Sequence, residues 1–148
     1  MDKNRERMSR PSWEVYALNL AYVAATRSED LRQVGACALD HNNRVIGLGY
    51  NGLAPGTNVK DSFWEDRDER RRFMIHAETN LMSLFKRGEA RLVAVTLLPC
   101  GSCATALAGY GVKKVVYGEL YNRDQGAIEI FNFYGIELQQ LAPTVKQT

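Results

Sequence analysis

One histidine and two cysteines in this chain have the residue types and the spacing of a zinc site. His76 and Glu78 stand two residues apart, and Cys100 and Cys103 follow as a C-x-x-C pair. One imidazole and two thiolates supply three strong zinc ligands and leave a fourth tetrahedral position for water. A structural zinc site normally has four protein ligands, whereas three ligands and an open position indicate catalysis. Glu78 is close enough to a ligand to handle the protons of that water without binding the metal.

Each half of this pattern has other interpretations when it is taken alone. A C-x-x-C pair is as compatible with a redox pair or half of a structural zinc site as with catalysis. The His76–Glu78 half is weaker still, because histidines are common at helix starts. The two halves together match the H-x-E…P-C-x-x-C pattern that is typical of zinc-dependent nucleobase deaminases. The other histidine, His41, is expected in a hairpin turn, and Cys37, in an apolar strand, is expected to be a buried, inert thiol.

Both halves of the pattern are expected at the first turn of a helix. Helical spacing of apolar residues predicts helices over residues 12–26, 77–86, 100–109 and 126–134. Apolar runs bounded by turn residues predict strands over residues 34–39, 44–49, 91–97, 112–117 and 136–141. Cys100 and Cys103 then directly follow a strand, where the free N–H groups of a helix start lower the pKa of a thiol.

The order of these elements is helix, two strands, and then alternating helices and strands. Such alternation favours an α/β fold with helices on the faces of a layered sheet. Residues 50–74 interrupt the order as a long irregular stretch, which at this length is usually functional or ordered by a partner. Within it, the mixed charges of residues 66–72 are interpreted first as a solvated face and second as a binding surface for nucleotide phosphates.

Length and composition limit the class of protein. The 148 residues fit a single domain, 1–148, with residues 1–10 expected to be flexible. A formal charge of +2 does not require a stable nucleic-acid partner. An odd number of cysteines, two of them spaced for metal, favours a reducing, cytoplasmic compartment. The polar N-terminus and the absence of a long apolar run argue against a secretory signal and a membrane span.

The similarity extends beyond the zinc motif. In four segments, two of which contain that motif, the chain resembles the deoxycytidylate (dCMP) deaminases, and the resemblance covers about residue 13 to residue 141. The segments are Val34-Gly35-Ala36-Cys37, Gly49-Tyr50-Asn51-Gly52, His76-Ala77-Glu78-Thr79-Asn80 and Leu98-Pro99-Cys100-x-x-Cys103. All cytidine-deaminase-like proteins share the zinc motif, whereas the Gly-Tyr-Asn-Gly segment and Asn80 narrow the resemblance to the dCMP branch. The resemblance implies a three-layer α/β/α fold, with a mixed five-stranded sheet and helices on both faces.

The resemblance also implies a reaction and its residues. The reaction is hydrolysis of dCMP to dUMP and ammonia, with one catalytic Zn²⁺ per subunit on His76, Cys100 and Cys103 and with Glu78 as the acid–base. Asn51 would hydrogen-bond the deoxyribose. The other substrate-binding residues that the resemblance implies are Ala77 and Pro99 at the pyrimidine, Arg27 and Ser28 near the phosphate, and Tyr121 and Arg123 in a closing loop. The open alternatives are a surface aromatic for Tyr121 and a solvated charge for Arg123.

By the same resemblance the protein would be a homohexamer, activated by dCTP and inhibited by dTTP, with Mg²⁺ accompanying the regulatory nucleotide. Tyr50, Asn51 and Gly52 would contribute to that allosteric site, although the glycines are also explained by tight turns. The chain departs from the family after Gly52, where the segment 53–56 is one residue longer than the usual Gly-x-Pro spacing. Residues 63–75 contain no cysteine or histidine for a second, structural zinc, so we expect one zinc per subunit.

Two rival functions stay open from the sequence. The first is deamination of another pyrimidine form, such as dCTP, the free nucleoside or a base in RNA. RNA is disfavoured because the net charge is small and no basic, aromatic-rich tail is present. The second is a catalytically silent nucleotide sensor, and Glu78 argues against it because a sensor has no need of a proton shuttle.

Overall fold

A mixed five-stranded sheet is the centre of the fold in a computed structural model that describes residues 6–145. Its strands lie in the order β2-β1-β3-β4-β5. Their bounds are β1 (Gly35–Asp40), β2 (Val45–Tyr50), β3 (Ala90–Leu97), β4 (Lys114–Glu119) and β5 (Glu137–Gln140). β1 pairs antiparallel with β2 and with β3, whereas β3, β4 and β5 run parallel to one another. The expected mixed sheet is therefore confirmed.

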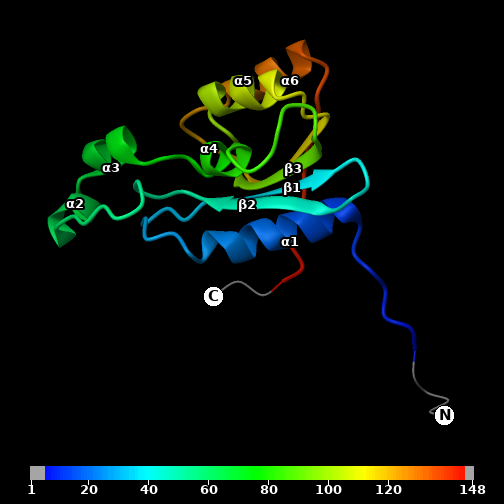
Figure 1. Ribbon diagram of the computed structural model, residues 1–148, viewed down its shortest axis with the longest axis horizontal. Coiled ribbons are helices and arrows are strands. Elements are labelled where there is room, and N and C mark those ends of the chain that lie inside the picture. Colours follow the sequence, from blue (N-terminus) through cyan, green and yellow to red (C-terminus); the bar gives the residue numbers. More distant parts are fainter. Residues whose placement is uncertain (1–5, 146–148) are drawn as a thin grey trace.

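Helices cover both faces of the sheet, as expected. One face carries α1 (Trp13–Ala25), and the other carries α4 (Ala77–Met82), α5 (Gly101–Gly109) and α6 (Gly126–Phe133), as Figure 1 shows. Ser12 is the N-cap of α1, because its hydroxyl accepts a hydrogen bond from the Val15 N–H at 3.2 Å. The helix predicted over residues 77–86 ends earlier, at Met82, and β4 begins two residues later than residue 112 and ends at Glu119.

The alternation of side chains along β1 divides the core between these two helical layers. Cys37 and Leu39 pack toward α1 beside Leu18, whereas Ala36 and Ala38 belong to the cluster under α4, α5 and α6. β3 lies between β1 and β4 and is covered on both faces, which explains its nearly continuous apolar sequence.

Gly49 in β2 allows α4 to lie close to the sheet. A Cβ at this position would lie 2.7 Å from the carbonyl oxygen of Ala77 and 2.9 Å from the backbone nitrogen of Leu81. Gly49, the first glycine of the Gly-Tyr-Asn-Gly segment, is thus explained by close packing against the helix that contains Glu78, rather than by a turn.

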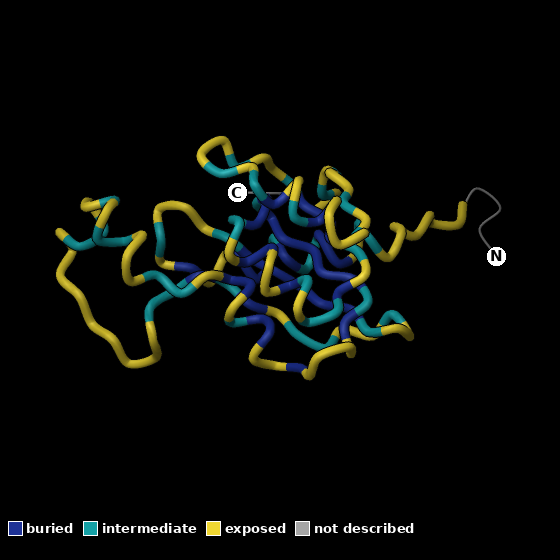
Figure 2. The backbone as a smooth tube through the Cα atoms, turned by 90° about the horizontal axis from the view of Figure 1, so that it is seen from above, coloured by how far each residue is buried: buried dark blue, intermediate teal, exposed yellow. Residues whose placement is uncertain are grey.

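The stretch 50–74 is not wholly irregular, which corrects the sequence-based expectation. It contains α2 (Asp61–Glu65) and α3 (Arg67–Phe73), and neither helix has a buried residue. Both helices project from one end of the sheet, where the chain in Figure 2 is mostly exposed or half-buried. An antiparallel bridge between Gly52 and Ile75, with N···O distances of 3.0 and 2.8 Å, closes the base of this projection.

His41 lies in the hairpin turn, where its Nε2 is 2.9 Å from the carbonyl oxygen of Gly88. Residues 6–10 form an exposed segment without secondary structure, and residues 1–5, also expected to be flexible, lie outside the described residues. Among the described residues, every helix is too short or too polar to cross a membrane.

Candidate active site

His76, Cys100 and Cys103 come together where α4 and α5 begin. His76 is the N-cap of α4, Cys100 is the N-cap of α5, and Cys103 lies in the first turn of α5. The His76 Nδ1 atom lies 3.2 Å from the Cys103 Sγ atom and 3.6 Å from the Cys100 Sγ atom. All three ligand atoms lie within 4.8 Å of one another. The fold therefore brings together three metal-binding atoms, although His76 and Cys103 are 27 positions apart in the chain.

The separations of these atoms fit a tetrahedral zinc ion. With Zn–N bonds of about 2.0 Å and Zn–S bonds of about 2.3 Å, nitrogen and sulfur ligands of one zinc lie about 3.6 Å apart. The two N···S distances, 3.2 and 3.6 Å, are close to this value. A donor set of one imidazole and two sulfurs also suits Zn²⁺ in its chemistry.

Hydrogen bonds within the cluster prepare one thiolate. Donation from the Cys103 thiol and then from His76 lowers the pKa of Cys100 to about 4. The interaction with Cys100, followed by burial, raises the pKa of Cys103. The hydrogen bond with Cys100 also raises the pKa of His76. Because zinc binds thiolates and neutral imidazole, metal binding would release these protons.

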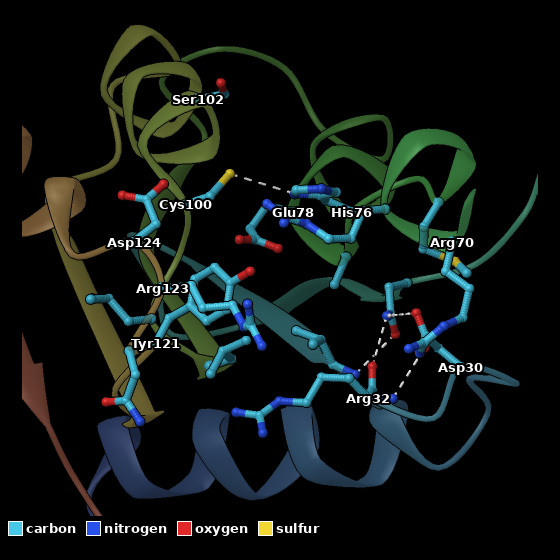
Figure 3. Close-up of a pocket in the computed structure, with 18 of the residues that line it drawn as sticks. Asp30, Arg32, Arg70, His76, Glu78, Cys100, Ser102, Tyr121, Arg123 and Asp124 are labelled. Atoms are coloured by element: carbon cyan, nitrogen blue, oxygen red, sulfur yellow. Dashed lines mark hydrogen bonds and ion pairs between the residues drawn. The ribbon is translucent and has the colours of Figure 1, made fainter. Parts of the chain in front are cut away.

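Glu78 lies beside the cluster with its carboxylate directed into the cavity between His76 and Cys100 (Figure 3). It is the second residue of α4 and is only 4% exposed. Burial raises the pKa of this carboxyl to about 7. A carboxyl group with a pKa near neutrality can both accept and return a proton, as a general acid–base must.

A cavity of about 530 Å³ opens in front of this cluster. Its walls come from α3, the start of α4, the start of α5, the loop before β1 and the loop after β4. The sequence-predicted residues among those that line it are Asn51, His76, Ala77, Glu78, Cys100, Tyr121 and Arg123. The structure thus brings seven of the predicted residues to one cavity.

Asn51 is held rigidly at the cavity wall. It is 7% exposed, and its Oδ1 accepts the N–H of Val34 at 2.9 Å. Its Nδ2 donates to the carbonyl oxygen of Arg32 at 2.9 Å and to Asp30 at 3.3 Å. Because both the oxygen and the nitrogen of the side-chain amide are hydrogen-bonded, the orientation of Asn51 is set before any ligand binds.

Several predicted residues do not line the cavity. The guanidinium carbon of exposed Arg27 lies 5.8 Å from the centre of the Tyr50 ring, and the buried Ser28 hydroxyl accepts the N–H of Asp30 at 3.2 Å. Pro99 is buried beside the cluster, and Gly52 is engaged in the bridge with Ile75. The lining of the cavity omits these four residues.

The charged residues of the cavity that were not among the predicted site residues are Asp30, Arg32, Arg67, Arg70, Arg71 and Asp124. The sequence favours a solvated face for the run 66–72, with the binding of nucleotide phosphates only as the second interpretation. Arg70 Nη1 and Asp30 Oδ1 form an ion pair at 2.7 Å, with 15% and 9% of their side chains exposed. Asp124 accepts the N–H groups of Gly101 and Gly126 at 2.9 Å each and so joins the starts of α5 and α6. The spacing of the three α3 arginines, at i, i+3 and i+4, was a signal for a shared helical face.

Comparison with known proteins agrees with the fold and the cluster. Residues 11–119 match the family model described as the cytidine and deoxycytidylate deaminase zinc-binding region. A crystal structure of dCMP deaminase from the cyanophage S-TIM5 superposes with a TM-score of 0.72, at 22% identity over 90% of this chain and 100% of that one. The chain belongs to the family of cytidine and deoxycytidylate deaminases defined by this zinc-binding region.

Curated relatives within the family are named deoxycytidylate deaminase. The one from Schizosaccharomyces pombe is 31% identical over 90% of this chain, and the human one is 27% identical over 88%. The chain spans 45% of the length of the yeast relative and 80% of the human relative.

Proposed function

We propose that this protein deaminates dCMP hydrolytically to dUMP and ammonia, with one zinc ion held by His76, Cys100 and Cys103. The observation that carries the proposal is the buried carboxylate of Glu78 beside three converging zinc ligands, at the end of a cavity that is large enough for a nucleotide. The names of the relatives support dCMP as the substrate.

The residues of the site have distinct tasks in this reaction. A zinc ion bound by the three ligands would supply water that is acidic enough to attack near neutral pH. Glu78 would receive one proton of the attacking water and pass it to N3 of the cytosine ring. It would then carry the hydroxyl proton from C4 to the amino group, which leaves as ammonia while the C4 carbonyl forms. Asn51, Ala77, Tyr121 and Arg123 are proposed to hold the nucleotide, with the buried residues Pro99 and Ser28 supporting the walls behind them.

Replacement of Glu78 by Gln tests the proton-transfer role. The variant keeps the size of the side chain but cannot exchange protons, so we expect kcat for dCMP to fall by about 10²–10⁴-fold with zinc content unchanged. Glu129→Gln, at an exposed position of α6, is the matched control and should keep full activity. Near-normal turnover in Glu78→Gln would contradict the assignment.

The competing substrate is dCTP, and one observation favours it. Five arginines line the cavity, which is more than one phosphate group needs. Ammonia release measured with dCMP, dCTP, deoxycytidine and CMP ranks these substrates. We expect dCMP to give the highest kcat/KM, and absence of dCMP turnover would reject the proposal. Absence of turnover with every substrate, together with nucleotide binding, would indicate a sensor.

Regulation and assembly are further parts of the proposal, supported by the resemblance to dCMP deaminases. We propose that dCTP with Mg²⁺ activates a cytoplasmic homohexamer, that dTTP inhibits it, and that Tyr50, Asn51 and Gly52 contribute to the effector site. The backbone bridge between Gly52 and Ile75 connects this segment to the residue before His76. Sigmoid dCMP kinetics that become hyperbolic with dCTP would support regulation, whereas an unchanged response would reject it.

A further inference from the structure

The cavity has two chemically different ends. Glu78 and the zinc ligands lie at one end. The arginines that line the rest of the cavity come from three separate segments, and in Figure 3 Arg32 and Arg70 lie beside Asp30 whereas Arg123 lies apart from them, near Tyr121. Arg27, the first choice for the phosphate from the sequence, points instead to the ring of Tyr50. The structure therefore leaves the phosphate-binding residues to be identified among the arginines that line the cavity.

Three of these arginines form a continuous wall on α3. Arg67, Arg70 and Arg71, here called the α3 wall, share one helical face because residues three and four positions apart are neighbours on a helix. Arg72 turns away from this face, and its guanidinium carbon lies 5.1 Å from the centre of the Phe73 ring. The arginines of the α3 wall therefore line the cavity, whereas Arg72, the next arginine of α3, does not.

The α3 wall has hydrogen-bonding capacity that the protein itself leaves unused. Arg67 and Arg71 form no ion pair with any residue from 6 to 145. Arg70 is fixed by Asp30 at 2.7 Å, yet its buried Nε has no hydrogen-bond partner within the described part of the chain. A buried donor without a partner is rare in folded proteins, and an oxygen of a bound anion would satisfy it.

The acidic groups of the cavity do not neutralise this wall. Asp30 is already paired with Arg70, and both oxygens of Asp124 accept backbone N–H groups. Glu78 lies at the zinc end. An excess of guanidinium groups remains, and guanidinium is the side chain best suited to a phosphate because it can donate two parallel hydrogen bonds.

We infer that the α3 wall binds the 5′-phosphate of the nucleotide, with Arg67 and Arg71 as the direct ligands and Arg70 held between them by Asp30. This inference rests on the proposed function and adds the residues that make the site select a nucleotide over a nucleoside. It replaces Arg27 as the phosphate ligand and assigns a role to the α2–α3 projection.

Single variants of the wall test the inference. A charge-assisted hydrogen bond to phosphate is worth roughly 10- to 100-fold in affinity, so Arg67→Ala and Arg71→Ala should each lower kcat/KM for dCMP by about that factor. Both should leave kcat/KM for deoxycytidine nearly unchanged. Arg72→Ala is the matched control on the same helix, and both of its values should equal those of the wild type. Because α3 has no buried residue, we expect all three variants to fold.

Calorimetry with zinc-loaded protein gives a readout that does not depend on turnover. We expect dUMP, but not deoxyuridine, to bind more weakly to Arg67→Ala and Arg71→Ala than to the wild type. Equal losses for nucleotide and nucleoside, or a nucleotide-specific loss only in Arg27→Ala, would overturn the inference. A loss confined to dCTP would also overturn the assignment to the first phosphate. Failure of wild-type turnover alone would reject the proposed function, while dUMP binding would still test the wall.

Discussion

The three cysteines of the chain differ in chemistry because each has a different environment. Cys37 is fully buried in β1, and burial raises the pKa of its thiol to about 12. Cys100 lies at a helix start with two hydrogen-bond donors, which lower its pKa to about 4. Position in the fold thus separates an inert thiol from a metal ligand.

This contrast predicts a reactivity pattern at pH 8. A thiol with a pKa of about 12 is only roughly one part in ten thousand thiolate at that pH, and access to Cys37 is blocked as well. In zinc-depleted folded protein, a disulfide reagent should therefore titrate Cys100 rapidly and Cys37 only after denaturant is added. Cys37→Ala should show the same rapid reaction of Cys100, and rapid reaction of Cys37 in the folded wild type would contradict the burial argument.

At the residue scale, the cluster of His76, Cys100 and Cys103 beside Glu78 could be predicted because short motifs contain these residues. The phosphate end could not be predicted in the same way. The i, i+3, i+4 spacing places Arg67 and Arg71 on one helical face with Arg70, but it does not show whether that face or the one with Arg72 lines the cavity. Only the three-dimensional course of the 53–74 segment decides which arginines face the cavity.

At the scale of elements, close contacts fix the helices on the sheet. Gly35 at the start of β1 lies so close to α1 that a Cβ there would be 1.9 Å from the carbonyl oxygen of Ala21 and 2.5 Å from the nitrogen of Ala25. Both are backbone atoms, so a side chain could be accommodated only by moving the helix.

Gly35→Ala should consequently lower the free energy of unfolding by about 2–4 kcal/mol, as measured by urea denaturation. Gly109→Ala is the matched control, because a Cβ at Gly109 meets no atom within 4 Å at the end of α5. That control should be neutral or stabilising by up to about 1 kcal/mol. Equal stabilities for the two variants would show that α1 is free to shift.

Most elements could be predicted from hydrophobic periodicity, and α2 and α3 could not. α3 has no apolar face to detect, and its order comes from polar interactions. The Asp66 Oδ1 accepts the N–H groups of Asp68 and Glu69 at 3.1 Å each, and arginines complete the last turn. A mixed-charge run of this kind is typical of both a solvated loop and a capped helix.

At the scale of the whole molecule, zinc would join parts of the chain that otherwise meet through packing. His76 begins α4 and Cys100 begins α5, and α1, α4, α5 and α6 all pack on one sheet. We propose that this arrangement forms one domain. The proposed hexamer remains a prediction that a sedimentation measurement would test.

Removal of zinc should accordingly lower the stability of the entire domain. A ligand present at 100 times its dissociation constant adds about 2.7 kcal/mol, which corresponds to a rise of roughly 5–10 °C in Tm for a domain of this size. Chelator treatment should lower Tm by at least that much, and added Zn²⁺ should restore it. An unchanged Tm after verified zinc removal would contradict a metal shared between α4 and α5.

Elemental analysis of purified protein that turns over dCMP tests the central claim most directly. We expect one zinc per chain in the wild type, and parallel loss of zinc and of dCMP turnover in Cys100→Ala. Fully active protein that contains no zinc or other transition metal would contradict the assignment of His76, Cys100 and Cys103 as the catalytic metal centre.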